Sequence, residues 1–281
     1  PEETPITQRG LIRPMAMANV QSGITRAFDL MPRELKKVAY RVYETRLRRQ
    51  LRPSALPRHV AVLADGNRRW AKARQLSVDD GHKAGAKNLE VITDHCLNLG
   101  IKYLTVYALS TENWQKRSPQ EVKGIFDLLV WLVQNNFQKY SQSGIKLNIL
   151  GDFTVFPDYV TQTITKAISV KVKNPKLTMN IALNYGGRDE LVTAVQKIIS
   201  QNISQDQITE NLISDNLYTA GQPEPELIIR PGGEVRLSNF LLWQSSYSEL
   251  YFSDILWPDF DPSCLDQAII WYQQRQRRLG K

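Results

Sequence analysis

The chain reads as short apolar runs separated by segments that have the hydrophobic period of a helix. Val60–Ala64 is a continuous apolar run, of the kind that forms a strand covered on both faces. Similar runs predict strands at 103–109, 145–150, 177–183, 227–230 and 250–252. Helices are predicted at 68–74, 84–98, 121–140, 158–170, 204–211, 240–244 and 261–278, with a further helix that ends near residue 200.

Strands and helices therefore alternate along most of the chain. This order predicts an α/β protein, a single domain with a central, mostly parallel sheet covered by helices. The segment 121–140 is apolar on more than one side. We therefore expect this helix to line an interior space and not merely to cover a surface.

The first 56 residues differ from the rest. Residues 1–31 mix small and polar residues with scattered apolar ones and predict a poorly ordered tail. Residues 32–56 predict a basic amphipathic helix, because apolar residues recur at helical spacing among many lysines and arginines up to Pro53. Two interpretations stay open: the 32–52 segment packs on the main domain with a solvated basic face, or it contacts an anionic membrane surface. Residues 57–281 form the predicted main domain.

Composition narrows the class of protein. The hydrophobic fraction of 42% supports a sizeable core, and no window approaches the ~18 apolar residues needed to span a bilayer. No secretory signal is visible, so we expect a cytoplasmic protein, soluble or peripheral to a membrane. The two cysteines, Cys96 and Cys264, are expected to be buried free thiols in a reducing compartment. The net charge of +8 suits nucleic acid, a membrane surface or anionic metabolites.

Polar or glycine-rich turns follow several predicted strands. In an open parallel sheet, ligands bind beyond the carboxyl ends of the strands, so these turns are expected to form one site. They are Asp65–Asn67, Ser110–Asn113, Gly151-Asp152, Asn184–Arg188 and Pro231–Glu234. The first of them lies between a strand and a helix, an arrangement that directs backbone N–H groups at an anion.

Arginines gather at the same turns, namely Arg68, Arg69, Arg230 and Arg236, with Arg117 and Arg188 as further candidates. The guanidinium group matches phosphate oxygens in two-point contact. A single arginine at a strand end is usually a surface ion pair. Several at one edge of a sheet indicate a site with room for two diphosphates.

Other side chains at these turns suit metal binding and proton transfer. Asp65 is either a turn or capping residue or, among arginines and phosphates, a ligand of Mg²⁺, which needs few protein carboxylates beside substrate phosphates. Glu249 is a candidate second carboxylate. His82 is a candidate proton carrier or phosphate donor, with a packing histidine as the alternative. Ser110 and Asn113 end a strand, where they are expected to hold substrate. The chain has no zinc spacing, Walker loop or dinucleotide fingerprint.

The chain resembles the cis-prenyltransferases, the undecaprenyl diphosphate synthase family, over about residues 56–281. The motifs that carry the resemblance are His59–Ala71, Gly81–Gly85, Tyr107–Trp114, Asn184–Arg188, Ile229–Gln244 and Glu249–Phe252. Residues 34–56 and 216–222 are most similar to the short-chain Z-farnesyl diphosphate synthase branch. The resemblance implies that residues 57–281 are a catalytic domain that encloses a hydrophobic tunnel, lined by the 120–140 helix and the strands at 103–109 and 145–150.

The resemblance also implies a role for each candidate. Asp65, Asn113, His82 and Ser110 would be catalytic; Gly66, Asn67, Arg68, Arg69, Trp70 and Arg117 would bind the allylic diphosphate; Arg230, Arg236, Ser238 and Gly280 would bind isopentenyl diphosphate. Asp65 and Glu249 would hold Mg²⁺. Arg278-Leu279-Gly280 matches a carboxyl-terminal motif that completes the partner subunit's site in a homodimer.

The implied activity is condensation of isopentenyl diphosphate with an allylic diphosphate to a cis (Z) polyprenyl diphosphate of short to medium length. Two alternatives stay open: irregular head-to-middle coupling of allylic diphosphates, and a non-catalytic partner subunit of a heteromeric enzyme. Nucleic acid is not an expected partner, because phosphates of the substrates account for the positive charge. Val78, Pro231 and the Gln115-Lys116 pair before Arg117 depart from the family pattern and bear on substrate preference.

Overall fold

The computed structural model describes residues 32–276, which belong to two compact units, 1–50 and 51–281. The expected tail at 1–31 lies outside the described residues. The first unit contains α2 (Arg33–Arg48), on which Leu35, Val38 and Val42 are exposed. The observed helix is shorter than the predicted range of 32–56, and a 3-10 turn, η2 (Pro53–Ala55), occupies the end of that range.

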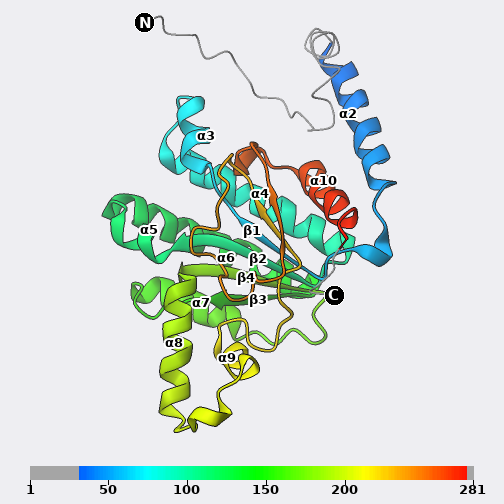
Figure 1. The fold of residues 1–281 in the computed structure, drawn as a ribbon. Helices are drawn as coiled ribbons and strands as arrows, with labels where there is room; N and C mark the ends of the chain where they lie inside the picture. Colours follow the sequence, from blue (N-terminus) through cyan, green and yellow to red (C-terminus); the bar gives the residue numbers. More distant parts are fainter. Residues whose placement is uncertain (1–31, 277–281) are drawn as a thin grey trace, which may run out of the picture. The chain divides into compact units, whose positions relative to one another are not determined.

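The second unit is built on one sheet of six parallel strands (Figure 1). The strands are β1 (His59–Leu63), β2 (Tyr103–Ser110), β3 (Ile145–Leu150), β4 (Leu177–Tyr185), β5 (Leu227–Arg230) and β6 (Glu249–Phe252). Their order across the sheet is β3-β4-β2-β1-β5-β6, and every pair of neighbours is parallel. The α/β fold and the parallel sheet are confirmed.

Helices surround this sheet. They are α3 (Asn67–Ala73), α4 (Val78–Leu99), α5 (Thr111–Lys116), α6 (Pro119–Ser143), α7 (Asp158–Ile168), α8 (Gly187–Ser200), α9 (Glu210–Asn216) and α10 (Pro262–Gln273), with short 3-10 turns η3 (Gln205–Gln207) and η4 (Trp257–Asp259). Local sequence sets the ends of α4: Ser77 and Asp80 form a capping box, and Gly100 takes the left-handed conformation that ends the helix. Within the described residues, no helix is both long and apolar enough to cross a membrane.

The core contains the central strands. All residues of β1 and β4 are buried, as expected for strands covered on both faces. A row of polar groups crosses this core: His59 Nε2 lies 2.8 Å from Thr105 Oγ1, and Asn180 Nδ2 donates to the same oxygen at 2.9 Å. Burial lowers the pKa of His59 to about 4, so this imidazole is neutral at pH 7.

Three local predictions need correction. Residues 111–116 form a helix, α5, because the Ser110 hydroxyl accepts a hydrogen bond from Asn113 N–H and caps the helix. Phe240–Gln244 is a turn and not a helix, although Phe240 and Leu241 are buried as expected. The helix predicted at 204–211 instead begins at Glu210, after the 3-10 turn η3. The two cysteines are buried and free, as predicted.

Candidate active site

The turn after β1 takes the predicted strand-turn-helix form. Gly66 has a φ of 109°, a left-handed conformation that side chains rarely adopt. A Cβ at this position would also lie 2.8 Å from the Leu256 side chain. Glycine is therefore required for the chain to turn from β1 into α3 and to expose the Asp65 carboxylate at the carboxyl edge of the sheet.

Two arginines hold the Asp65 carboxylate. Arg69 Nη2 lies 3.0 Å from Oδ1, and Arg230 Nη2 donates to Oδ2 at 3.0 Å. The Arg230 side chain is 6% exposed, whereas that of Asp65 is 32% exposed. The turn after β1 and the end of β5 therefore meet, as predicted from the positions of their residues at strand ends.

Arg230 also organises the loop that follows β5. Its Nη1 donates to Ser238 Oγ at 2.8 Å and to the backbone oxygen of Arg236. From the other side, Arg69 Nη1 donates to the carbonyl oxygen of Gly232 at 2.5 Å. The same loop thus contacts arginines from both turns. At the exposed surface of this loop, the Arg236 guanidinium forms an ion pair with Glu234.

A second cluster joins α4 to the α5–α6 junction. His82 Nε2 lies 3.2 Å from Glu121 Oε1, and Arg117 Nη1 lies 3.3 Å from the same oxygen. All three side chains are mostly buried. Burial lowers the pKa of His82 below its usual value, with Glu121 acting in the opposite direction. Burial likewise lowers the pKa of Arg117, and the Arg68 charge adds to this effect.

Buried polar atoms without partners concentrate here. Across the described residues, four buried side-chain nitrogen or oxygen atoms lack a hydrogen bond within the protein: Asn67 Oδ1, Arg117 Nε, Arg230 Nε and Gln244 Oε1. Three of the four belong to the site. Because native proteins rarely leave such atoms unpaired, this concentration points to a polar ligand.

A cavity of about 730 Å³ opens from this cluster of polar groups. Its polar residues include Asp65, Asn67, His82, Ser110, Glu112, Asn113, Arg117, Arg230, Arg236, Ser238 and Asn239. An adjoining cavity of about 320 Å³ is lined by Ala64, Asp65, Gly66, Asn67, Arg68, Arg69, His82 and Arg117. Arginine guanidinium groups and the turn after β1 thus line the two adjoining cavities. This lining suits the binding of anionic groups.

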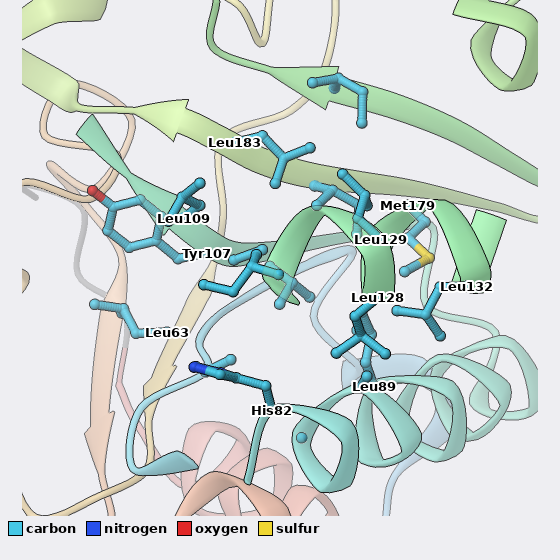
Figure 2. A pocket seen from close by; sticks show the side chains of 18 of the residues that line it. Leu63, His82, Leu89, Tyr107, Leu109, Leu128, Leu129, Leu132, Met179 and Leu183 are labelled. Atoms are coloured by element: carbon cyan, nitrogen blue, oxygen red, sulfur yellow. The ribbon is translucent and has the colours of Figure 1, made fainter. Parts of the chain in front are cut away.

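The rest of the larger cavity is mostly apolar and follows the sheet. It is lined by Val106, Leu109, Ile125, Leu128, Leu129, Leu132, Val133, Ile145, Leu147, Ile149, Met179, Ile181 and Leu183, among others. Figure 2 shows His82 and Tyr107 toward one end and Leu89, Leu128 and Leu132 gathered toward the other. The lining includes Ile145, the first residue of β3, so the cavity spans that six-residue strand, about 20 Å. The predicted tunnel lined by 120–140, 103–109 and 145–150 is confirmed.

An irregularity in β2 shapes the junction between the two parts. Tyr107 pairs with Ala182 and Leu109 with Leu183, so Ala108 is an extra residue in β2. In a regular strand only alternate residues face one side. Here consecutive residues from Val106 to Ser110 all line the cavity, because the bulge turns the end of the strand. Nothing in the local sequence pattern predicts this bulge.

Trp70, Glu249 and the further candidate Arg188 do not join this cluster, and Arg188 lines neither cavity. Trp70 Nε1 donates to Asp259 Oδ1 at 2.7 Å, and its ring stacks against Arg74, so it does not line either cavity. Glu249 is the first residue of β6 and pairs with Arg275 at 3.2 Å. Gly280 lies outside the described residues. Every other predicted site residue lines one of the two cavities.

Within one chain, Glu249 does not lie at the same edge of the sheet as Asp65. Glu249 pairs in register with Leu227, whereas Phe252 pairs with Arg230 at the carboxyl edge. Three residues of strand, about 10 Å, therefore separate Glu249 from that edge. A residue that begins a parallel strand lies at the edge of the sheet away from the site.

A metal at this site would have Asp65 as its carboxylate. Over the part of the chain that the structure describes, no group of three or more His, Cys, Asp or Glu residues could hold a metal ion. Mg²⁺ does not need such a group, because it keeps several waters and uses one or two carboxylates with substrate phosphates. The residues present therefore fit a magnesium ion that arrives with a phosphate group.

Residues that the motifs did not single out complete the site. Glu121 contacts His82 and Arg117, and Asn239 Nδ2 donates to Glu112 Oε1 at 3.0 Å. The Asn239 side chain also accepts a hydrogen bond from the Arg188 N–H at 2.9 Å, which ties the β5 loop to the start of α8. Glu121 lies four residues after Arg117, and Asn239 directly follows Ser238, but His82 and Glu112, the residues that they contact, are distant in sequence.

Comparisons with known proteins agree with this geometry. A family model described as undecaprenyl diphosphate synthase matches residues 63–280. An isoprenyl transferase of Clostridium perfringens is 45% identical over 229 residues, which cover 80% of this chain and 90% of the relative. An isoprenyl transferase of Neisseria gonorrhoeae is 45% identical over 231 residues, which cover 82% of this chain and 92% of the relative.

A solved structure is similar over most of the chain. It is lavandulyl diphosphate synthase from Lavandula x intermedia in complex with dimethylallyl diphosphate. The TM-score is 0.78 and the sequence identity 34%, with 81% of this chain and 100% of that chain covered.

Proposed function

This chain belongs to the undecaprenyl diphosphate synthase family of prenyltransferases, and we propose that it condenses isopentenyl diphosphate with an allylic diphosphate to a cis (Z) polyprenyl diphosphate. One observation carries the proposal: a single cavity has guanidiniums at one end and an apolar lining along the rest. A prenyl diphosphate has the same two parts, an anionic head and an apolar chain. We assign residues 57–281 as the catalytic domain.

The allylic diphosphate would occupy the smaller cavity. The groups that line it supply backbone N–H donors from Gly66 and Asn67 and positive charge from Arg68, Arg69 and Arg117. Its opening toward Asp65 and His82 would place the allylic C1 atom at the entrance of the apolar part. The chain of the primer would then lie along the wall formed by β3, β4 and α6.

The isopentenyl diphosphate would bind on the β5 side. Arg230, Arg236 and Ser238 line the larger cavity close to Asp65. Arg230 uses its Nη atoms on Asp65 and Ser238, but its buried Nε has no partner within the described protein. That N–H is a free donor for an oxygen of the second diphosphate.

Magnesium is the proposed cofactor, held by Asp65 together with substrate phosphates. When bound, it would neutralise charge that grows on the departing diphosphate. For Asp65 to bind it, the carboxylate must exchange at least one of its two arginine partners for the ion. The released guanidinium would remain beside the phosphate oxygens, where it stabilises the same charge.

The chemical step follows from this arrangement. The C4 atom of isopentenyl diphosphate attacks the allylic C1, the C1–O bond breaks, and diphosphate leaves with the electron pair. Loss of a proton from C2 of the isopentenyl unit then forms the new double bond. His82, Ser110 and Asn113 line the cavity beside the arginines, so they would orient the reacting groups and accept or relay this proton.

Product length and the manner of coupling are further parts of the proposal. The length of the apolar cavity supports a product of short to medium chain length. A second candidate reaction is irregular coupling of two allylic diphosphates, since the similar solved structure is named lavandulyl diphosphate synthase. The intact set of Arg230, Arg236 and Ser238 favours ordinary isopentenyl binding. The partly exposed Asp65 carboxylate at the arginine cluster argues against a non-catalytic subunit, which would have no use for it.

We also propose a cytoplasmic homodimer that contacts a membrane surface through α2. The exposed apolar residues Leu35, Val38 and Val42 on this helix alternate with basic residues, which suits an anionic lipid surface. The buried free thiols of Cys96 and Cys264 suit a reducing compartment. A sedimentation experiment with anionic and neutral vesicles, on the full chain and on a variant lacking residues 32–50, tests the membrane contact.

The activity is tested with purified protein, Mg²⁺, labelled isopentenyl diphosphate and allylic primers of one to four isoprene units. Product mass gives chain length, and NMR of the product gives double-bond geometry. Cis-extended chains are expected. Incorporation of label into no primer would refute elongation, and a branched product from dimethylallyl diphosphate alone would instead establish irregular coupling.

A further inference from the structure

Glu121 lies just outside both cavities yet contacts two residues that line them. Its Oε1 atom is 3.2 Å from His82 Nε2 and 3.3 Å from Arg117 Nη1, and its side chain is 13% exposed. We propose that Glu121 is a positioning residue that fixes the ring tautomer of His82 and thereby makes the other ring nitrogen, Nδ1, the proton acceptor of the reaction. This inference rests on the proposed function and specifies which atom accepts the proton.

Local sequence explains why Glu121 is available. It is the third residue of α6, three positions after the capping Ser118, and its N–H donates to Ser118 Oγ at 3.2 Å. A glutamate at this position commonly folds back to complete a capping box. Here its carboxylate reaches instead toward α4 and the junction with α5.

The chemistry of the contact determines the tautomer. A carboxylate beside a guanidinium has only acceptor oxygens, so the hydrogen between Glu121 and His82 belongs to the imidazole Nε2. In the neutral ring, Nδ1 then carries the lone pair. The same relation between a carboxylate, an imidazole and a proton to be moved occurs in hydrolase triads, where the carboxylate orients the ring.

Burial favours the neutral form of the His82 ring, and the charges around the ring act in both directions. Burial lowers its pKa most, and the Arg117 charge lowers it further. Glu121 and, from the same helix as His82, Asp79 raise it. Asp65, Arg68 and Arg69 also line the smaller cavity with His82. A neutral imidazole can accept a proton, whereas an imidazolium cannot, so this balance suits a base.

A purely structural role for Glu121 would be to hold α6 against α4. Other contacts already do this farther along the two helices: Asn136 Nδ2 donates to Glu90 at 2.8 Å, and Lys139 Nζ lies 3.0 Å from Asp94. Of these three contacts, only the Glu121 contact involves His82 and Arg117, which line both cavities. Its loss is therefore expected to change the reaction more than the packing of these helices.

The first test reads the tautomer directly. The chain contains only three histidines, so ¹⁵N–¹H spectra of the ring nitrogens are simple, and the spectrum of His82→Gln assigns the His82 signals. The wild type is expected to show the Nε2–H form. Glu121→Gln keeps the shape of the side chain, but its amide can donate or accept a hydrogen bond, so both His82 tautomers are expected. The His82 pKa is also expected to be lower, because the negative charge of Glu121, which raises it, has been removed. A wild-type Nδ1–H form, or unchanged signals in Glu121→Gln, would overturn the inference.

The second test is kinetic and uses Asp127→Asn as the matched control. Asp127 is an ion-paired carboxylate on the same helix, but it contacts Lys123 and Tyr159 at the surface. Glu121→Gln is expected to lower kcat about tenfold to a hundredfold, as for other residues that orient a reacting group. The acid limb of its pH–rate profile is expected to move to lower pH, with the KM for isopentenyl diphosphate nearly unchanged.

The outcomes separate this inference from the proposed function. Asp127→Asn is expected to behave as the wild type in both rate and pH profile. An unchanged pH profile in Glu121→Gln would refute the positioning role even if the protein were an active prenyltransferase. If the wild type extended no primer, the proposed function would fail, and the tautomer of His82 would still decide whether Glu121 orients the ring.

Discussion

Replacing Asp65 by asparagine tests the centre of the site. The carboxylate balances two guanidiniums, each 3.0 Å away, and asparagine keeps its shape while removing the charge. Without that charge, the diphosphate no longer competes with Asp65 for Arg69 and Arg230. The variant is therefore expected to bind inorganic diphosphate more tightly than the wild type in the absence of Mg²⁺, and to gain little from adding Mg²⁺.

The structure also sets the cost in stability. The Arg69 pair is half exposed and is worth up to about 1 kcal/mol. The hydrogen bond from the buried Arg230 to a charged acceptor is worth about 1.5–3 kcal/mol. The asparagine amide oxygen recovers part of this, so the free energy of unfolding is expected to fall by about 1–3 kcal/mol. For a domain of this size the melting temperature would fall by about 2–12 °C.

Three measurements check these expectations together. Calorimetric titration with diphosphate, with and without Mg²⁺, gives the affinities, thermal unfolding gives the stability, and the condensation assay gives turnover. Turnover is expected to fall by orders of magnitude while the variant remains folded. If Asp65→Asn kept the wild-type dependence of diphosphate binding on Mg²⁺, or retained near-normal turnover, Asp65 would not be the metal ligand.

Other predictions concern the walls of the site and the core. Gly85→Ala is expected to lower kcat without unfolding the chain, because its Cβ would lie 2.9 Å from Asn67 Nδ2 and displace that side chain. Steady-state kinetics measure kcat, and circular dichroism checks the fold. A wild-type kcat in the folded variant would refute this expectation. Leu132→Trp is expected to shorten the products by filling the cavity, whereas Trp131→Ala on the exposed side of α6 should leave the products unchanged. Products of the same size from Leu132→Trp and the wild type would refute the assignment of the cavity. His59 has its pKa lowered to about 4 in the folded state, so the unfolded chain binds its proton first as pH falls. The free energy of unfolding is therefore expected to fall by about 2 kcal/mol from pH 7 to pH 5 on this account, a loss that His59→Gln should abolish in denaturant titrations; an identical pH dependence in the variant would disprove it.

The sequence predicted the meeting of two distant turns without any structure. Asp65 follows β1 and Arg230 ends β5, and a parallel sheet brings the carboxyl ends of its strands to one edge. The ion pair between them is the outcome. The apolar lining of the cavity was predicted for a similar reason, since a helix that is apolar on more than one side must face an interior.

Glu249 and Trp70 lie away from the cluster in this chain, for equally specific reasons. Glu249 was placed by its motif, whereas the direction of β6 puts the start of that strand at the other edge of the sheet. Trp70 was placed at the site by the resemblance, but its indole N–H donates to Asp259, a residue far along the chain. Neither the rotation of a side chain about its helix nor the position of a distant acceptor can be read from local sequence.

By itself, the sequence determined most of the elements, the parallel direction of the strands and the collection of arginines with one carboxylate, because hydrophobic period and strand-end chemistry are local properties. Tertiary structure alone decided which side chains touch. Glu121 and His82 are on different helices, and only the packing of α6 on α4 brings them to 3.2 Å. The bulge at Ala108 depends likewise on pairing with β4. Contacts of this kind arise from long-range packing, for which the chain carries no periodic signal.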